Sequence, residues 1–237
     1  MENKTTFYPH LSVDCVLIGF DGTDLKVLLV ERSNIPKSPD YHDMKLPGRL
    51  IYEGEDLDDA ANSVLSEVIK NKRPYIRQFK TFGSPMRTSN PKDVLWLENA
   101  VKLKIGRLVT VAYMALIRID GKISLDLGKY QGHWISLSQL PVLAFDHNQI
   151  IDEAREHIMQ MAKLEPRSLF ELMPPKFTAL QLRRLYELVY QKPMDVRNFH
   201  KKITSLPYIV PLDEREKNVS HRAARYYKFD KKKCLTV

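Results

Sequence analysis

The sequence predicts an α+β chain with two domains, a larger one built on a β-sheet and a smaller one of two helices and two strands. In the larger part, apolar β-rich runs alternate with helical patterns. Two prolines at 174–175 then interrupt the chain, and they block any continuous helix. We therefore place the domains at 1–165 and 177–237, joined by a linker at 166–176.

The first strands are expected within residues 11–33, where two apolar runs are divided by an Asp-Gly pair. Such a pair is a hairpin signal. A further strand is predicted at 108–119, and another, followed by a turn, at 133–141. Residues 148–164 repeat apolar side chains on one helical face, so we expect a connecting helix there.

The segment PGRLIYEGEDLDDAANSVLSEVI, residues 47–69, changes from a loop composition to a helical one. Asp56 or Asp58 can cap this helix. Its apolar residues recur at helical spacing and predict one buried face. They are Leu57, Ala60, Ala61, Val64, Leu65 and Val68.

This segment resembles the Nudix box, a pattern of glycine, five residues, glutamate, seven residues, Arg-Glu and an aliphatic residue, then any residue, Glu-Glu, any residue, glycine and an aliphatic residue. Glu55 matches the first glutamate, and Glu67 keeps a metal-binding glutamate. Further positions of the box have changed type. They are Arg49, Ser63, Val64, Val68 and Lys70.

The resemblance implies an α/β/α sandwich with a mixed sheet. Nudix hydrolases use the box carboxylates to hold divalent metal against a diphosphate, because hard cations need several oxygen ligands. One helical glutamate between two valines makes a poor magnesium site. We therefore expect no catalytic residues, no bound metal and no cofactor, and a domain that senses a small effector.

In Nudix folds the ligand lies against the box loop and the neighbouring strands. Arg49 is the most suggestive candidate, because a guanidinium can neutralise a phosphate where metal is absent. The alternative is that the Arg49 side chain fills the position of the lost metal site. For the aromatic candidates, Tyr113 and Trp134, the alternative is a position in the core. The full set of effector candidates is Arg32, Arg49, Glu55, Glu67, Arg107, Tyr113 and Trp134.

Residues 85–106 are longer than expected between the corresponding strands. Trp96 and its two leucine neighbours give this segment apolar surface. We expect this segment to be a short helix at a dimer interface, a lid over the effector or a local insertion. We assign it no catalytic role.

The C-terminal domain has the order helix, turn, helix, strand, loop, strand. Thr178 can cap a helix over 179–191, and Asp195 can cap a second over 196–206. Its inward face is expected to hold Val196, Phe199, Ile203 and Leu206, with basic residues outside. This pair forms a helix-turn-helix, and the strands at 208–212 and 225–230 form a wing.

Charge is divided unevenly between the domains. The chain of 237 residues carries a net charge of +8, but residues 176–237 hold 15 Lys and Arg against 6 Asp and Glu, a net +9. The remainder is therefore close to neutral at −1. Such asymmetry favours a nucleic-acid-binding module, although a basic surface also serves solubility.

The C-terminal segments FTALQLRRLYELVY, MDVRNFHKKI and HRAARYYKFD, with LAFDH at 143–147, resemble the Nudix-related transcriptional regulators. The resemblance implies a homodimer that binds double-stranded operator DNA through the winged helix. It also implies a small-molecule effector, either a sugar such as arabinose or xylose, which would connect the protein to carbohydrate metabolism, or ADP-ribose. The general resemblance of the chain to these regulators slightly favours a sugar as the effector.

The DNA-binding candidates lie on the second helix, at the first cap and in the wing. Arg suits guanine edges, Lys suits phosphates and Asn suits adenine. Each also has a simpler role as a solvated or capping side chain. The candidates are Thr178, Arg197, Asn198, His200, Lys201, Lys202, His221, Arg222 and Arg225.

Composition sets outer limits. A hydrophobic content of 43% is enough for buried cores. Cys15 and Cys234 are too few for a disulfide framework. The N-terminus lacks a signal pattern, and no apolar run approaches the roughly 20 residues that span a bilayer. We expect a cytoplasmic protein without a membrane partner.

These observations favour an effector-responsive DNA-binding regulator. The first alternative is an active Nudix hydrolase of a nucleoside diphosphate derivative, which needs metal ligands from outside the box, such as Glu53 or Glu98; magnesium-dependent turnover discriminates it. The second is an RNA-associated or protein-interaction module. The test that separates this module from a sequence-specific regulator is whether nucleic-acid binding has a base-specific component that survives raised salt.

Overall fold

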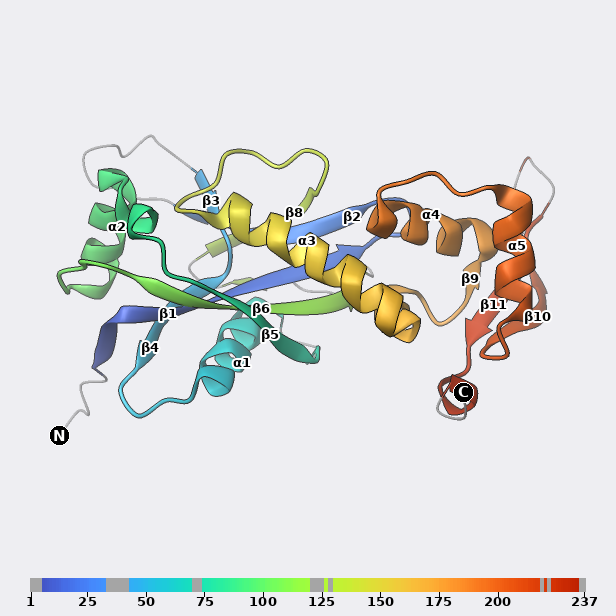
Figure 1. Cartoon of the computed structure of the whole chain (residues 1–237), viewed down its shortest axis with the longest axis horizontal. Coiled ribbons are helices and arrows are strands. Elements are labelled where there is room, and N and C mark those ends of the chain that lie inside the picture. The colour runs from blue at the N-terminus through green and yellow to red at the C-terminus, as the bar shows by residue number, and fades with distance from the viewer. Residues whose placement is uncertain are drawn as a thin grey trace. The chain divides into compact units, whose positions relative to one another are not determined.

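The structure is a computed structural model. It describes residues 6–32, 43–69, 74–119, 126–127, 130–217, 220 and 223–234. The chain forms two compact units, whose elements are shown in Figure 1. The first unit comprises residues 1–19, 26–116 and 120–156. The second comprises residues 20–25, 117–119 and 157–237.

The first unit is built on a sheet with the strand order β5-β6-β1-β2-β8-β7, to which β4 adds on β1 and β3 on β2. The described pairs β1–β4, β2–β3, β2–β8, β5–β6 and β7–β8 are antiparallel. The strands are β1 (Phe7–Phe20), β2 (Leu25–Arg32), β3 (Asp43–Lys45), β4 (Gly48–Tyr52), β5 (Ile76–Phe82), β6 (Val109–Arg118), β7 (Asp126–Leu127) and β8 (Tyr130–Ser136).

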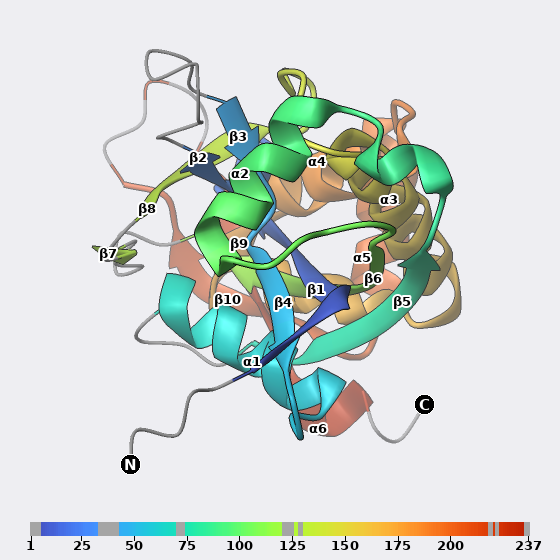
Figure 2. The ribbon, with the colours of Figure 1, turned by 90° about the vertical axis from the view of Figure 1, so that its left-hand side faces the viewer.

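Helices cover both faces of this sheet. Figure 2 shows α1 (Leu57–Val68) on one side and the start of α3 (His147–Leu164) on the other. The fully buried side chains of β1 and β2 lie between them, and α3 contributes Ile150 and Ile151 from its buried face. This is the expected α+β architecture with a sheet between helices.

The β1–β2 turn forms as the Asp-Gly signal predicts. Asp21 accepts hydrogen bonds from the backbone N–H groups of Thr23 and Asp24, both at 2.9 Å. Gly22 has φ of 102°, a conformation that glycine adopts without steric cost. The turn belongs to the second unit, where the Thr23 carbonyl accepts a hydrogen bond from Arg184 Nε at 3.1 Å.

Helix α1 begins at the predicted cap. The Asp56 side chain accepts a hydrogen bond from the Asp58 N–H at 2.9 Å, an arrangement that contributes about 1 kcal/mol. The expected apolar face is buried at Ala60, Ala61 and Val64, with Leu65 and Val68.

Residues 85–106 form a packed helical segment. A 3-10 helix, η1 (Pro85–Thr88), precedes α2 (Pro91–Val101), which begins at the cap residue Asn90. Leu97 of α2 packs in a cluster with Leu50 of β4. The segment therefore helps to build the core of the first unit beside the box loop.

The second unit holds the winged helix. Its sheet has the order β10-β11-β9, and the wing strands lie close to their expected ranges. The elements are η2 (Pro166–Leu172), β9 (Phe177–Thr178), α4 (Ala179–Tyr190), α5 (Val196–Ser205), β10 (Ile209–Arg215), β11 (Arg225–Phe229) and α6 (Lys231–Cys234). Strand β9 and helix α6 were not expected from sequence.

Aromatic packing forms the core of this unit. Phe170 stacks on Phe229 with ring centroids 4.1 Å apart, and Tyr186 of α4 meets Phe199 of α5 edge to face at 5.6 Å. Phe170 lies in η2, inside the stretch expected to be a linker, so that stretch carries core residues. Val196 was expected to face inward, but its side chain is exposed because it lies in the first turn of α5.

None of the helices within the described residues is both long enough and apolar enough to cross a membrane.

Candidate functional site

The box loop connects β3 to β4 and packs tightly on β1. The Pro47 carbonyl accepts a hydrogen bond from the Cys15 N–H at 2.8 Å. A Cβ on Gly48 would lie 2.2 Å from Asp14 Oδ1 and 2.5 Å from the Val13 carbonyl oxygen. Only glycine fits at that position without moving β1.

Arg49 and Glu55 form an ion pair at the start of the box. Arg49 Nη2 lies 2.5 Å from Glu55 Oε1, and Nη1 lies 2.8 Å from Oε2. Nη1 also donates to the Leu50 carbonyl at 3.0 Å. The guanidinium lies over the Tyr52 ring, 4.4 Å from its centroid. The hydrogen bond from Arg49 holds the pKa of Glu55 below its ordinary value.

Glu67 is exposed on α1, whereas Val64 and Val68, at the other two metal-binding positions of the box, are buried. Among the described residues, no group of three His, Cys, Asp or Glu side chains could hold a metal ion. The interior positions of Val64 and Val68 follow from the apolar stripe that packs α1 on the sheet.

The remaining effector candidates make contacts elsewhere in the first unit. The Tyr113 ring is buried and its hydroxyl donates to Asp58 Oδ1 at 2.6 Å. Arg107 is exposed and donates to the Gly83 carbonyl at 2.7 Å. Trp134 is half-buried in β8, opposite Leu28.

Arg32 has a structural position rather than a ligand-facing one. Its side chain is 1% exposed. Nε and Nη2 donate to the two carboxylate oxygens of Asp43, with 2.7 Å between Nε and Oδ1. Nη2 also lies 2.6 Å from Asp93 Oδ1 of α2. With its charge neutralised inside the fold, Arg32 is not retained in the proposed effector site.

A second charged cluster, which sequence reasoning missed, lies beneath the box loop. Arg87 Nη2 donates to Asp14 Oδ2 at 2.6 Å, and its Nη1 donates to Asp146. His147 Nε2 lies 3.7 Å from the same Asp14 oxygen. We call Asp14, Arg87, Asp146 and His147 the buried charge cluster. The one available signal was an aspartate within the otherwise apolar β1 run.

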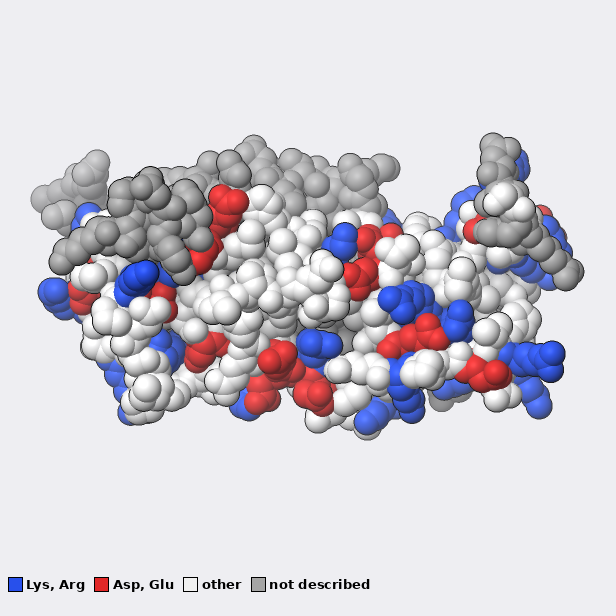
Figure 3. Space-filling model, turned by 90° about the horizontal axis from the view of Figure 1, so that it is seen from above, with Lys and Arg blue, Asp and Glu red and all other residues white. Residues whose placement is uncertain are grey.

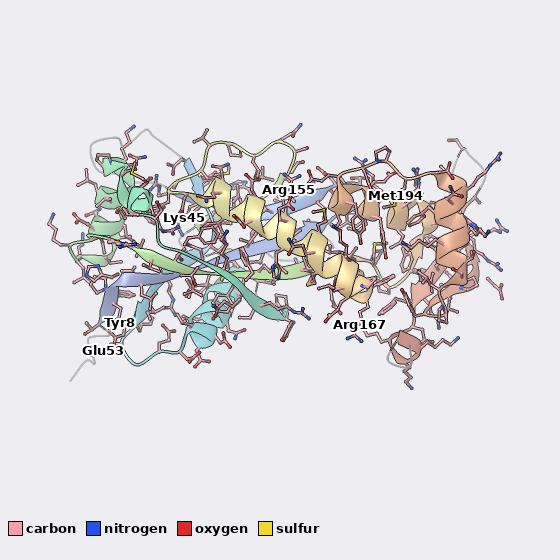
Figure 4. All side chains as sticks on the ribbon, in the orientation of Figure 1. Tyr8, Lys45, Glu53, Arg155, Arg167 and Met194 are labelled. Carbon is pink, nitrogen blue, oxygen red and sulfur yellow. The ribbon has the colours of Figure 1, made fainter. Side chains whose placement is uncertain are left out.

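The charge of Asp14 is stabilised by its neighbours. Burial opposes its ionisation, but the contacts with His147 and Arg87 outweigh burial and hold the pKa of Asp14 below its usual range. Lys45, labelled in Figure 4, lies nearby at the end of β3. It donates to the carbonyls of Leu46 and Gly48 at 2.9 and 3.1 Å. Burial lowers the pKa of Lys45 to about 8.

The buried charge cluster joins the box loop to the first residue of α3. The Leu46 N–H donates to His147 Nδ1 at 2.9 Å, so that nitrogen carries no proton. Phe145, two residues earlier, has φ of 55°, a strained conformation for a bulky residue. Its N–H donates to Asp93 Oδ2 at 3.0 Å, which helps to hold this turn.

In the second unit, Thr178 serves as a helix cap. Its hydroxyl accepts a hydrogen bond from the Gln181 N–H at 3.2 Å, while the Gln181 side chain accepts one from the Thr178 N–H at 2.9 Å. This is a capping box. Thr178 also pairs with Tyr226 in the sheet and is 3% exposed. It orients α4, and its side chain is already engaged there.

The outer face of α5 is cationic. The Asp195 side chain caps the helix, accepting from the Asn198 N–H at 2.8 Å, and Phe199 and Ile203 bury the inner face. The outer residues are exposed, and Figure 3 shows Lys and Arg side chains on the surface of this unit. They are Arg197, Asn198, His200, Lys201 and Lys202.

Two of these outer residues touch their own domain. His200 Nε2 lies 3.4 Å from the Tyr227 hydroxyl, and Lys202 Nζ lies 5.8 Å from the centre of the Tyr186 ring. In the wing, Arg225 Nη2 pairs with Asp213 at 3.0 Å while remaining exposed. His221 and Arg222 lie outside the described residues.

Comparisons with known proteins agree with this arrangement. Residues 169–229 match the family described as NrtR DNA-binding winged helix domain. The Acinetobacter baylyi protein named ADPR responsive transcriptional repressor NtrR is 25% identical over 225 residues, covering 93% of this chain and 82% of that protein.

Solved structures cover almost the entire chain. Shewanella oneidensis NrtR complexed with a 27mer DNA has a TM-score of 0.69 and 28% identity, with 95% of each chain covered. A MutT/nudix family protein from Enterococcus faecalis, 23% identical, shares the fold with a TM-score of 0.62 over 94% of this chain and 88% of its own. The chain, a Nudix-type sheet domain followed by an NrtR-type winged helix, belongs to the Nudix-related transcriptional regulators.

Proposed function

We propose that this protein is a transcriptional repressor that binds operator DNA through α5 and the wing, and that ADP-ribose binding to the first unit changes its affinity for the operator. The observation that carries the proposal is the exposed cationic face of α5 in a module that matches the NrtR winged helix. Exposed Arg and Lys on such a helix supply base and phosphate contacts.

ADP-ribose is the effector that the relatives favour. The Acinetobacter baylyi relative is named for its response to ADPR, whereas the comparisons lend no support to the sugar that the sequence slightly favoured. The chemistry of the box loop is compatible with ADP-ribose, because Arg49 presents a planar guanidinium that suits phosphate oxygens.

The effector acts by linkage. We propose a homodimer that places two copies of α5 in successive major grooves of a palindromic operator. Leu46, in the loop between β3 and β4, is hydrogen-bonded to His147, the first residue of α3. A ligand that moves this loop would therefore shift α3 and change the spacing of the two copies. ADP-ribose must then bind the free and operator-bound forms with different affinities.

Residual hydrolysis of ADP-ribose is a second candidate activity. Glu67 keeps its box position and is exposed on α1, so one carboxylate remains available for a magnesium ion. Release of AMP from ADP-ribose that depends on magnesium and is lost in Glu67→Gln would establish this activity.

The first test is a gel-shift titration of the full chain against the DNA upstream of its own gene, with and without ADP-ribose. Arabinose and xylose serve as matched additions. We expect a specific complex whose midpoint moves with ADP-ribose alone. An unchanged midpoint with every addition would contradict effector control, and loss of the complex to random competitor DNA would contradict operator recognition.

A further inference from the structure

Arg49 is already paired with an internal anion, the carboxylate of Glu55. Its side chain is 16% exposed and that of Glu55 is 17% exposed, so the pair is partly accessible to solvent. Arg49 Nε is buried and, among the described atoms, has no hydrogen-bond partner. The guanidinium therefore keeps one unsatisfied donor even while Glu55 occupies the other side.

The geometry of the pair matches that of a phosphate contact. Glu55 offers two oxygens to two guanidinium nitrogens, at 2.5 and 2.8 Å. A phosphate presents the same fork of acceptor oxygens, with more charge and further oxygens.

The guanidinium is held in place independently of Glu55. It lies over Tyr52 at 4.4 Å, and Tyr52 stacks on Phe7 with centroids 4.5 Å apart. The Leu50 carbonyl accepts one of its protons at 3.0 Å. When Glu55 leaves, these contacts keep the fork oriented, so little ordering entropy is lost on binding a new anion.

Glu55, in contrast, has one main attachment besides Arg49, the Tyr52 N–H that donates to Oε2 at 2.9 Å. It lies in the short stretch between β4 and α1, next to Gly54 with φ of 78°. A side chain in such a connection can swing outward without disturbing the core.

We propose that Glu55 is a built-in competitor that occupies the phosphate subsite on Arg49, and that a pyrophosphate-type ligand binds by exchanging with it. The inference rests on the proposed function and assigns the chemistry of its effector subsite. Arg49 is the anion-binding residue, and Tyr52 orients its guanidinium. A ligand must bind Arg49 strongly enough to displace the Glu55 carboxylate, so singly charged ligands compete with Glu55 poorly.

The test measures binding of inorganic pyrophosphate and ADP-ribose by calorimetry to the wild-type chain and to Glu55→Gln. The amide keeps the shape and an acceptor but loses the charge, and a charge-assisted hydrogen bond is roughly twice as strong as a neutral one. We expect pyrophosphate to bind about tenfold more tightly to Glu55→Gln. Arg49→Lys, which keeps charge but loses the fork, should abolish the gain when combined with Glu55→Gln.

Glu187→Gln is the matched control. Glu187 pairs with Arg183 at 2.7 Å, and their side chains are 22% and 14% exposed for Arg183 and Glu187 respectively. The control removes the same charge from a comparable Arg–Glu pair in the other unit. Equal tightening in this control would assign the gain to net charge and overturn the proposal. Unchanged or weaker pyrophosphate binding in a folded Glu55→Gln protein, checked by thermal melting, would also overturn it.

The two proposals fail in different ways. If ADP-ribose binds and shifts operator affinity but Glu55→Gln leaves the affinity for pyrophosphate unchanged, the subsite is wrong and the regulator stands. If ADP-ribose binds no form of the protein, the proposed effector is wrong. The pyrophosphate measurement then decides the Arg49 subsite by itself.

Discussion

The cationic side chains of the first unit and those of α5 differ in whether they have partners within the fold. In the first unit, Arg32, Arg49 and Arg87 each meet a carboxylate within the same fold. On α5, in the part of the chain that the structure describes, Arg197 and Lys201 form no ion pair and project outward. Both regions are rich in cations, but only one has neutralised them internally.

This difference separates structural charges from binding charges. A buried pair costs desolvation and contributes stability only when its geometry and hydrogen bonds are complete. An exposed cation costs almost nothing to maintain and is available to a phosphate. Arg49 is intermediate, because it is paired yet partly accessible, and for that reason we place ligand exchange there.

The largest expected effect comes from breaking the buried charge cluster. Asp14→Asn should lower the free energy of unfolding by about 3–5 kcal/mol, since it removes one of the two carboxylates that neutralise the buried Arg87 charge. Urea denaturation measures this loss. Asp152→Asn is the control, because Asp152 is 69% exposed in its pair with Arg155 and should cost below about 1 kcal/mol. Equal losses in both variants would contradict the distinction.

The exposed region is tested at Arg197. Arg197→Ala should weaken specific operator binding by about 1–3 kcal/mol if the guanidinium reads a base, while non-specific binding changes much less. Titration against operator and random DNA measures both terms. The free energy of unfolding should stay within about 0.5 kcal/mol of wild type, as for an exposed side chain. Loss spread equally over all sequences would assign Arg197 to phosphate.

Lys45 provides a pH test within the paired region. Its pKa in the folded protein is about 8, below the ordinary value of 10.5, so the unfolded chain binds more protons between these values. Stability from this group therefore rises with pH in that window. Relative to Lys45→Met, the wild type should gain about 1.5 kcal/mol between pH 8 and 9.5.

Urea titrations at each pH measure this gain. Lys80→Met is the matched control, because Lys80 is 45% exposed in its pair with Glu153 and should show no such rise. A flat difference between wild type and Lys45→Met would show that Lys45 keeps its ordinary titration.

The smallest effect is expected at Lys201. Lys201→Ala should reduce the slope of log affinity against log salt concentration by about 1, which corresponds to the loss of one phosphate contact. Gel shifts at several salt concentrations measure the slope. Lys104→Ala, which removes a 91% exposed lysine from the first unit, should leave the slope unchanged. An unaltered slope in Lys201→Ala would place that side chain away from DNA.

Local sequence signals were sufficient to predict the elements that are bounded by turn residues or helix-capping residues. The turn at Asp21 and Gly22, the cap of α1 at Asp56 and the cap of α5 at Asp195 all form as expected. Each depends on a side chain bonding to backbone within three residues, so no distant contact is needed to specify it. Val196 shows the limit, since apolar spacing predicted burial that the first turn of α5 does not provide.

The fold class, the helix pair of the second unit and the cationic α5 were determined by the sequence alone, because they follow from periodicity, capping and residue type. The altered metal positions of the box were identified through the resemblance to the Nudix pattern. The tertiary structure decided which charges are satisfied. It buried Arg32 between Asp43 and Asp93, paired Arg49 with Glu55 and joined Asp14 to Arg87 and His147. Such pairings join residues 6 to 133 positions apart, and electrostatic partners at those separations are set by packing rather than by local pattern.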